Sequence, residues 1–399
     1  MEVLSLVNWA PLRYETLKWE NISDLQYLSR KSRSKILPTY ESSLPNTIFD
    51  KNVILTPELD DKISDFMTHI SRLDLIQSQK GFSFPCVLFR SESAASSQIE
   101  NLTSSIKNIA LAELSTKVPQ NAQLVARNVR AMRSALKTPE ILSIPSILNI
   151  YKILMFSAQD SWPGDFRKEA VWIGGTSYSP HEAIFVPPHH SRIGYYMNDL
   201  ISYSNRTDLN PIVKAAIIHA QFETIHPFID GNGRTGRTLI HKSLKDDGVL
   251  KEVALPISAG LLNNTSKYMD SLISFQEGNP MPIIEEIFKA LESSLIVGEK
   301  ASQNISLIIE KWMNTIEEKA SSSIWKFLYL LVEQPVVNST YISNKLGISI
   351  RGANKLIDRA IDYGCIRRIG NKQRDIFYQA DDIIAVMDEI SDLSILRRI

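Results

Sequence analysis

The feature that most constrains this chain is a polar, glycine-rich loop between two apolar segments. PIVKAAIIHAQFETI (211–225) precedes the loop and RTLIHKSL (237–244) follows it, and both have helical spacing. The loop, HPFIDGNGRTGR (226–237), combines a histidine, a carboxylate, glycines and arginines. The chain therefore has to leave one helix, turn tightly and start another, and Pro211 fits the first turn of the first helix.

The residue types of this loop suit a phosphate ligand. A glycine-rich turn that leads into a helix exposes several backbone N–H groups, which together with the helix dipole attract an anion. Arg234 and Arg237 add guanidinium groups for phosphate oxygens, and Asn232 adds an amide donor. A neutral His226 can accept a proton from a hydroxyl, and Asp230 is an oxygen ligand suited to Mg²⁺. The loop predicts a phosphate-transfer site.

Each of these residues also has a structural interpretation. A histidine beside an apolar helix is usually a core residue, Asp-Gly-Asn-Gly is most often a turn, and arginines at a helix start are often solvated. Their joint occurrence in this order favours function. The chain lacks a Walker A motif, and a helix precedes the loop where a Rossmann fingerprint needs a strand. His219 and His226 lack the i, i+4 spacing of a helical zinc site.

Composition narrows the class of protein. The 399 residues suggest two or three domains. The 44 basic and 44 acidic residues cancel, so the whole chain has no net attraction to nucleic acid or anionic membrane. Cys86 and Cys365 are far apart, which predicts no disulfide framework. Because neither a signal peptide nor an apolar run of about 20 residues is evident, we expect a soluble cytoplasmic protein.

Elsewhere the pattern predicts a mainly α protein. Residues 1–60 predict an extended arm with some short helix. A β-hairpin is expected within 163–188, because Gly174-Gly175 separates VWI from IFV. Apolar spacing predicts further helices at 57–80, from 91 to about 114, and at 121–136, 145–157 and 193–205.

The last hundred residues predict a winged helix. A helix over 322–333 is followed by two helices broken at Gly347 and by two short strands around Gly370-Asn371. The recognition helix would span about 349–363, and its basic face and the wing could meet DNA phosphates. The neutral overall charge argues against tight nonspecific DNA binding, so target recognition or self-association is the favoured role. The residues of this patch are Arg351, Asn354, Lys355, Arg359, Arg367, Arg368, Lys372 and Arg374.

The loop resembles the signature of the Fic (filamentation induced by cAMP) domain family, H-x-F-x-[D/E]-G-N-G-R-x-x-R, at every defining position. Members transfer AMP from ATP to a hydroxyl of a protein, and fewer transfer other phosphate-containing groups. The resemblance covers roughly residues 35–295 and implies a helical core with a β-hairpin flap. The phosphotransferase branch has a lysine where this chain keeps Gly233 and Arg234, so the resemblance implies nucleotidyl transfer.

The resemblance also implies roles for single residues. His226 would be the general base, Phe228 a buried anchor and Asp230 the Mg²⁺ ligand. Arg234 would contact the β-phosphate and Arg237 the γ-phosphate. Tyr268 would line the adenine pocket, with an ordinary core role as the alternative. The implied ATP-binding set is Gly231, Asn232, Gly233, Arg234, Thr235, Gly236, Arg237 and Tyr268.

An inhibitory motif is implied upstream. SSQIEN (96–101) is similar to the family pattern [S/T]-x-x-x-E-[G/N]. A helix at about 91–105 would carry Ser96 and bring Glu100 to Arg237. Because Arg237 cannot bind a carboxylate and a γ-phosphate at once, the pair would inhibit transfer. The alternative is a solvated charge on a helix face.

The patterns and the resemblance together predict three units: an N-terminal regulatory region (1–120), a Fic catalytic core (121–295) and a winged-helix domain (300–399). FRKEAVWIGG and FVPP resemble the segments around the family's flap, so a target protein would dock at about 172–188 by β-augmentation. A homodimer is a further possible assembly.

The expected function is Mg²⁺- and ATP-dependent transfer of AMP to Ser, Thr or Tyr of a target protein and of the chain itself, inhibited by Glu100. Three rivals stay open. The first is a hydrolase that removes AMP, the second a nucleotide-sensing DNA-binding regulator, and the third an enzyme that transfers another group such as phosphocholine.

Overall fold

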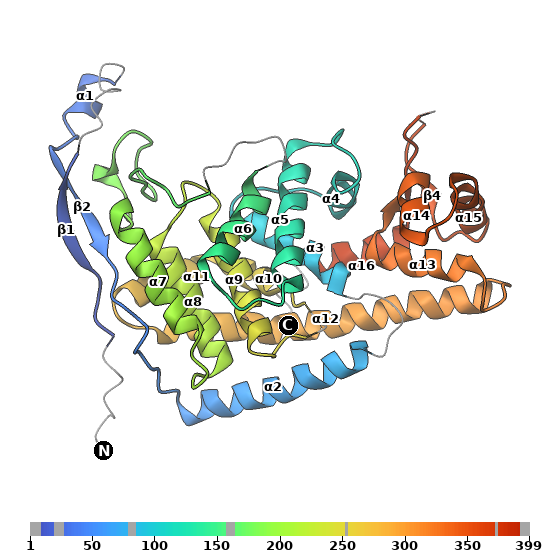
Figure 1. Ribbon diagram of the computed structural model, residues 1–399, viewed down its shortest axis with the longest axis horizontal. Helices are drawn as coiled ribbons and strands as arrows, with labels where there is room; N and C mark the ends of the chain where they lie inside the picture. Colours follow the sequence, from blue (N-terminus) through green and yellow to red (C-terminus); the bar gives the residue numbers. More distant parts are fainter. Residues whose placement is uncertain are drawn as a thin grey trace.

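A computed structural model describes residues 9–19, 28–78, 85–156, 164–251, 254–371 and 374–391 (Figure 1). Within these ranges the protein is mostly helical with two small antiparallel sheets, so the prediction of a mainly α fold is confirmed. Among the residues described, none of the helices is long and apolar enough to cross a membrane. The expectations for residues 1–8 and for Lys372 lie outside the described residues.

The centre of the fold is the helix pair α8 (Pro211–Ile225) and α9 (Asn232–Asp246). α8 begins as predicted, with Pro211 in its first turn and Asn210 as its N-cap. Nearly all side chains of α8 are buried, which explains why its sequence has no polar face. A buried polar residue such as Lys214 is paired, here with Asp247 at 2.6 Å. The loop between α8 and α9 is therefore fixed by two buried helices.

The remaining helices of this core surround that pair. α7 (Ile193–Ser204) packs on α8, and α5 (Gln120–Lys137) and α6 (Ile144–Met155) pack on α9. α10 (Ile257–Asn263) and α11 (Thr265–Gln276) pack on α12 (Met281–Thr315). α2 (Pro57–Ser78) lies along α12 on the outside of the core (Figure 1). The helices predicted at 57–80, 121–136, 145–157 and 193–205 are confirmed within a few residues.

The single helix predicted from residue 91 to about 114 is wrong. The structure has α3 (Pro85–Ile99), a break, and α4 (Ile106–Ala112). α3 ends because Asn101 adopts the left-handed conformation with φ 60°. The N–H groups of Asn101 and Leu102 then donate to Gln98 and Ser97 carbonyls, both at 2.9 Å. This backbone requirement gives a physical reason for Gly or Asn after the glutamate of the motif.

The N-terminal arm contains a ribbon that the sequence did not predict. β1 (Arg13–Lys18) and β2 (Thr39–Leu44) pair antiparallel, and among the described residues before α2 the four-residue α1 (Arg30–Arg33) is the only helix. RYETLK and TYESSL are too polar for a strong strand pattern. The ribbon is attached to the flap, because the Ser43 N–H donates to the Val186 carbonyl (3.0 Å) and the Ser42 hydroxyl to the Pro187 carbonyl (3.0 Å).

The predicted flap hairpin is reduced to one bridge within the described residues. Ile173 pairs with Phe185, and Gly174 and Gly175 both have positive φ. A short 3-10 helix, η2 (Pro180–Glu182), lies in the connection between the two bridge residues. Pro180 cannot donate a hydrogen bond to a ladder, which explains why the pairing stops.

The C-terminal elements follow the predicted order. α13 (Ser323–Glu333), α14 (Ser339–Leu346) and α15 (Ile350–Asp362) surround a sheet of order β3-β5-β4. The sheet consists of β3 (Val336–Val337), β4 (Arg367–Arg368) and β5 (Tyr378–Gln379), and Gly347 is left-handed between α14 and α15. α12 runs without interruption across the boundary predicted at 295–300. α16 (Asp381–Ser391) returns to pack on α3 and α12 (Figure 1).

One buried guanidinium joins this C-terminal unit to α3. Arg90 of α3 donates to Glu113 (2.7 Å) and to the Glu333 carbonyl (2.6 Å), and it also bonds the Gln334 side chain. The Gln334 amide in turn donates to the Ala110 carbonyl at 2.8 Å. The helix that ends next to Glu100 is therefore held by α13 and by the end of α4.

Removal of Arg90 tests this connection. Arg90→Met leaves the buried acceptors around it without their donor, so we expect the free energy of unfolding to fall by about 3 kcal/mol. Lys62→Met is the matched control, because it breaks an ion pair with Glu58 that lies on the surface. Urea unfolding of both variants measures the difference. Equal, small effects of the two substitutions would contradict the connection.

Candidate active site

The loop between α8 and α9 is shaped by two left-handed residues. His226 ends α8 with φ 49° and ψ 60°, and its N–H donates to the Phe222 carbonyl at 2.9 Å. Gly231 precedes α9 with φ 78°, and a Cβ there would lie 2.7 Å from the Met155 sulfur. The first backbone bond of α9 runs from the Thr235 N–H to the Gly231 carbonyl (3.0 Å). The N–H groups before it have no acceptor within the helix, so they are available to an anion.

Two side chains make the loop rigid. Asn232 accepts from the Phe228 N–H (2.9 Å) and donates to the Phe228 carbonyl (2.8 Å). The Asn232 amide expected at the phosphate is thus used by the loop itself. Phe228 is buried and stacks on Tyr151 of α6, with ring centroids 3.6 Å apart, as its predicted anchor role requires. The bonds of His226 and of Phe228 therefore fix the backbone on both sides of Pro227, and with it the position of His226.

His226 has the protonation state that a general base needs. Its Nδ1 lies 3.3 Å from the Glu223 carbonyl, and because a carbonyl only accepts, Nδ1 carries the hydrogen in this bond. The lone pair of Nε2 is then available. Burial lowers the pKa of His226 to about 4, and the Arg167 charge adds to the effect. The imidazole is therefore neutral at pH 7.

Arg167 is a residue of this site that sequence reasoning missed. Its guanidinium is buried and donates to three carbonyls, those of His226 (2.9 Å), Glu169 (2.9 Å) and Pro188 (2.7 Å). It thereby ties both ends of the flap to the loop. In the sequence Arg167 stands next to the exposed Lys168, and no pattern indicates which of the two cations is buried.

Asp230 and Arg234 lie at the edge of the loop. The Asp230 side chain is 71% exposed and lies 3.5 Å from Arg234 Nη2. Arg234 is buried, and its Nε has no hydrogen-bond partner in the described part of the chain. No group of three or more metal-binding side chains exists among the described residues. A single exposed carboxylate beside a phosphate site nevertheless fits Mg²⁺, which is often held by one carboxylate and the phosphates.

Arg237 is bound by the end of α3. Its Nε donates to the Ser96 hydroxyl (2.9 Å), and its Nη2 donates to the Ser96 carbonyl (2.8 Å) and to Glu100 Oε1 (2.9 Å). The guanidinium side chain is 2% exposed and the carboxylate side chain 39%. A Cβ added to Gly233 would collide with the Glu100 carboxylate. Glu100 therefore lies over the first turn of α9, where a phosphate is expected.

Three predicted ATP-binding residues lie in the interior. Gly236 faces α8, because a Cβ there would collide with Glu223. Thr235 is fully buried. Tyr268 is 1% exposed, and its hydroxyl lies 2.7 Å from His219 Nε2. These placements put the Thr235 and Tyr268 side chains in the interior of this structure. The assignment of the three residues to the ATP site stays a prediction, with the core role as the alternative for Tyr268.

Glu223 is a second residue that sequence reasoning missed. Its Oε1 is buried without a hydrogen-bond partner among the described residues. Burial raises the pKa of Glu223 to about 8, although the Arg237 charge opposes the shift. Glu223 is therefore mostly protonated at pH 7. In the sequence it reads as one more residue of an apolar helix, with no signal of its contact with Gly236.

The fold and the loop define a helical protein with an anion site and a neutral histidine beside it. The Fic/DOC family model matches residues 141–244, which run from just before α6 to α9. This chain therefore contains a domain of the Fic/DOC family.

Two curated relatives agree with this assignment. A probable protein adenylyltransferase of Aquifex aeolicus (strain VF5) is 32% identical over 198 residues, which cover 48% of this chain and 56% of the relative. Protein adenylyltransferase Fic of Drosophila willistoni is 29% identical over 157 residues, covering 39% and 28%. The chain thus spans between about a quarter and just over half of these relatives.

The crystal structure of a Fic family protein from Desulfovibrio desulfuricans G20 superposes with a TM-score of 0.53 at 20% identity. The superposition covers 82% of this chain and 97% of the other. At this identity the likeness concerns the fold alone.

The state of Glu223 predicts a pH dependence of stability. Between about pH 4.5 and 8 the folded chain keeps a proton on Glu223 that the unfolded chain has lost, so stability falls as pH rises. The slope is at most about 1.4 kcal/mol per pH unit. Glu223→Gln removes this term, so its stability relative to wild type should increase from pH 5 to 8. Urea midpoints of the two proteins that change in parallel would contradict the assignment.

Proposed function

We propose that this chain transfers AMP from ATP to Ser, Thr or Tyr hydroxyls of a target protein and of itself. The observation that carries the proposal is a neutral His226, with Nε2 available, beside the start of α9 and its two arginines. The two curated relatives are named as protein adenylyltransferases, one of them as probable, which supports the same reaction.

The chemistry balances with the residues present. The target hydroxyl oxygen attacks the α-phosphorus and forms a new P–O bond, and the bond from that phosphorus to the pyrophosphate oxygen breaks. His226 Nε2 takes the hydroxyl proton, and pyrophosphate leaves with the electron pair. Arg234 and the first N–H groups of α9 hold the phosphates. Mg²⁺ bound by Asp230 would offset phosphate charge.

The reaction is inhibited in cis by Glu100 in this proposal. Arg237 is the γ-phosphate ligand implied by the family signature, and its Nη2 is already bonded to Glu100. The carboxylate also covers Gly233, so it excludes the phosphate both electrostatically and sterically. Displacement of the end of α3 would free Arg237 for ATP.

The target protein docks on the flap at about 172–188. Supporting this, the flap has a single bridge, between Ile173 and Phe185, which leaves other backbone groups for pairing with an extended peptide. The Val186, Pro187 and Pro188 carbonyls are not among them, because Ser43, Ser42 and Arg167 already bond to these carbonyls. ATP, Mg²⁺ and a chain with only two cysteines fit a cytoplasmic enzyme. Self-association as a homodimer stays part of the proposal.

DNA is the less favoured partner of the C-terminal unit, which we take to be a winged helix. Two of its predicted DNA-contacting arginines already form ion pairs within the chain, Arg359 with Glu318 and Arg367 with Asp381. Arg351 and Lys355 on α15 are exposed. Recognition of a protein is therefore the favoured role of this unit.

Removal of AMP is the second candidate reaction. The favouring observation is the Glu100 carboxylate, which is partly exposed at the phosphate site and has one oxygen bonded to Arg237. A carboxylate in this position can exclude a phosphate, and it can also take a proton from an attacking water.

Labelled ATP distinguishes these reactions. With Mg²⁺ and α-labelled ATP, we expect label on wild-type protein, more on Glu100→Gly and Glu100→Gln, and at least about 10²-fold less when His226→Ala is added. Glu100→Gln is the matched control, since it removes the charge and keeps the helix end. Label from γ-labelled ATP would mean phosphotransfer instead. Absence of any label on the chain or on lysate proteins in every variant would contradict AMP transfer.

A further inference from the structure

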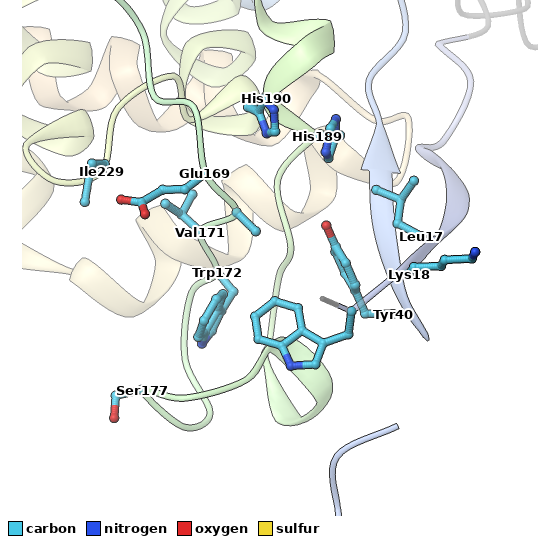
Figure 2. A pocket seen from close by; sticks show the side chains of 12 residues that line it. Leu17, Lys18, Tyr40, Glu169, Val171, Trp172, Ser177, His189, His190 and Ile229 are labelled. Atoms are coloured by element: carbon cyan, nitrogen blue, oxygen red, sulfur yellow. The ribbon is translucent and has the colours of Figure 1, made fainter. Parts of the chain in front are cut away.

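A cavity of about 880 Å³ lies between the β1–β2 ribbon and the flap (Figure 2). Its walls come from Leu17, Trp19 and Tyr40 on the ribbon side and from Trp172 on the flap, and Glu169 and Ile229 border it. This volume is enough for a large side chain with its neighbouring backbone.

The cavity lies next to the catalytic loop. Ile229 is part of that loop, between Phe228 and Asp230, and its side chain is 61% exposed. A molecule in the cavity therefore touches the loop that His226 begins. The occupant that this position favours is a segment of the protein whose hydroxyl is modified.

The aromatic walls are held in place before anything binds. The Trp19 ring meets Tyr40 and Trp172 edge-on, each with centroids 5.7 Å apart. The Trp172 indole N–H donates to the Thr176 carbonyl at 2.6 Å, so the ring orientation is fixed. Ribbon and flap are further joined by the ion pair of Lys35 with Glu182 (2.6 Å).

Glu169 is the only carboxylate among the described residues that line the cavity, which also include Lys18, His189 and His190. Glu169 is exposed, and its side chain has no ion pair or hydrogen bond with the residues that the structure describes. The nearby Arg167 uses its donors on carbonyls. Figure 2 shows Glu169 on the Ile229 side of the cavity, while the Lys18 ammonium extends away from it. Aromatic rings and a free carboxylate together favour a cation.

We propose that this cavity binds an arginine or lysine side chain of the target protein next to the modified hydroxyl. The cation would pair with Glu169 and lie against the Trp19 and Trp172 rings, and the planar guanidinium of arginine suits this best. The inference deepens the proposed AMP transfer and rests on it.

Peptides test the inference directly. The full-length Glu100→Gly chain is given Mg²⁺, α-labelled ATP and glycine-alanine peptides with a central Ser, Thr or Tyr. Each peptide carries arginine, its neutral isostere citrulline, or glutamate at one of the three positions on either side. We expect arginine to be preferred over citrulline about five- to tenfold at one position. Glu169→Gln and Trp19→Leu should each reduce that preference to twofold or less, and Asp165→Asn, the control outside the cavity, should keep it.

Self-labelling in the same reactions separates the two claims. If the chain labels itself but no position prefers arginine, the cavity inference is overturned and AMP transfer stands. If neither the chain nor any peptide is labelled, the AMP-transfer proposal fails. The cavity inference is then tested separately by peptide binding. For that arm, tryptophan fluorescence of His226→Ala is titrated with the arginine and citrulline peptides. Equal binding of the two peptides overturns the inference, and tighter arginine binding that Glu169→Gln abolishes supports it.

Discussion

The buried guanidinium of Arg237 is the constraint around which this protein is organised. A charge removed from water has to be bonded, and in this structure the end of α3 accepts three hydrogen bonds from Arg237, on Ser96 and Glu100. That requirement fixes where α3 ends and how it approaches α9. In the proposed reaction a phosphate and the Glu100 carboxylate would compete for this same donor, which would give the site two states.

Because α3 holds Arg237, whatever holds α3 acts on the site. Arg90, near the other end of α3, is bonded to Glu113, Glu333 and Gln334, and α16 packs on the same helix. The C-terminal unit is thus mechanically connected to Glu100 through one helix of 15 residues. If Glu100 inhibits the site as proposed, a protein that binds this unit would have a physical route to it, since movement of α13 or α16 would change the packing of α3.

The sequence predicted the parts of this structure that local patterns determine. The apolar segments around 226–237 require two helices, and the glycines and charges of the loop indicate its ligand. Long-range packing decided the rest. Gly236 faces α8, and Tyr268 is buried beside His219 of α8, because α9 and α11 both pack on α8. The β1–β2 ribbon is polar, Arg167 looks like its exposed neighbour, and Glu223 has no local signal, so none of these was foreseeable without the fold.

The competition at Arg237 is tested most directly by nucleotide binding. Calorimetric titration compares a non-hydrolysable ATP analogue and ADP, each with Mg²⁺, on wild type and on Glu100→Gly. The account predicts that the substitution tightens binding of the ATP analogue about ten- to a hundredfold, the size of a charge-assisted bond, and changes ADP binding much less, because only the γ-phosphate needs Arg237. Equal gains for both nucleotides, or no gain for either, would contradict it.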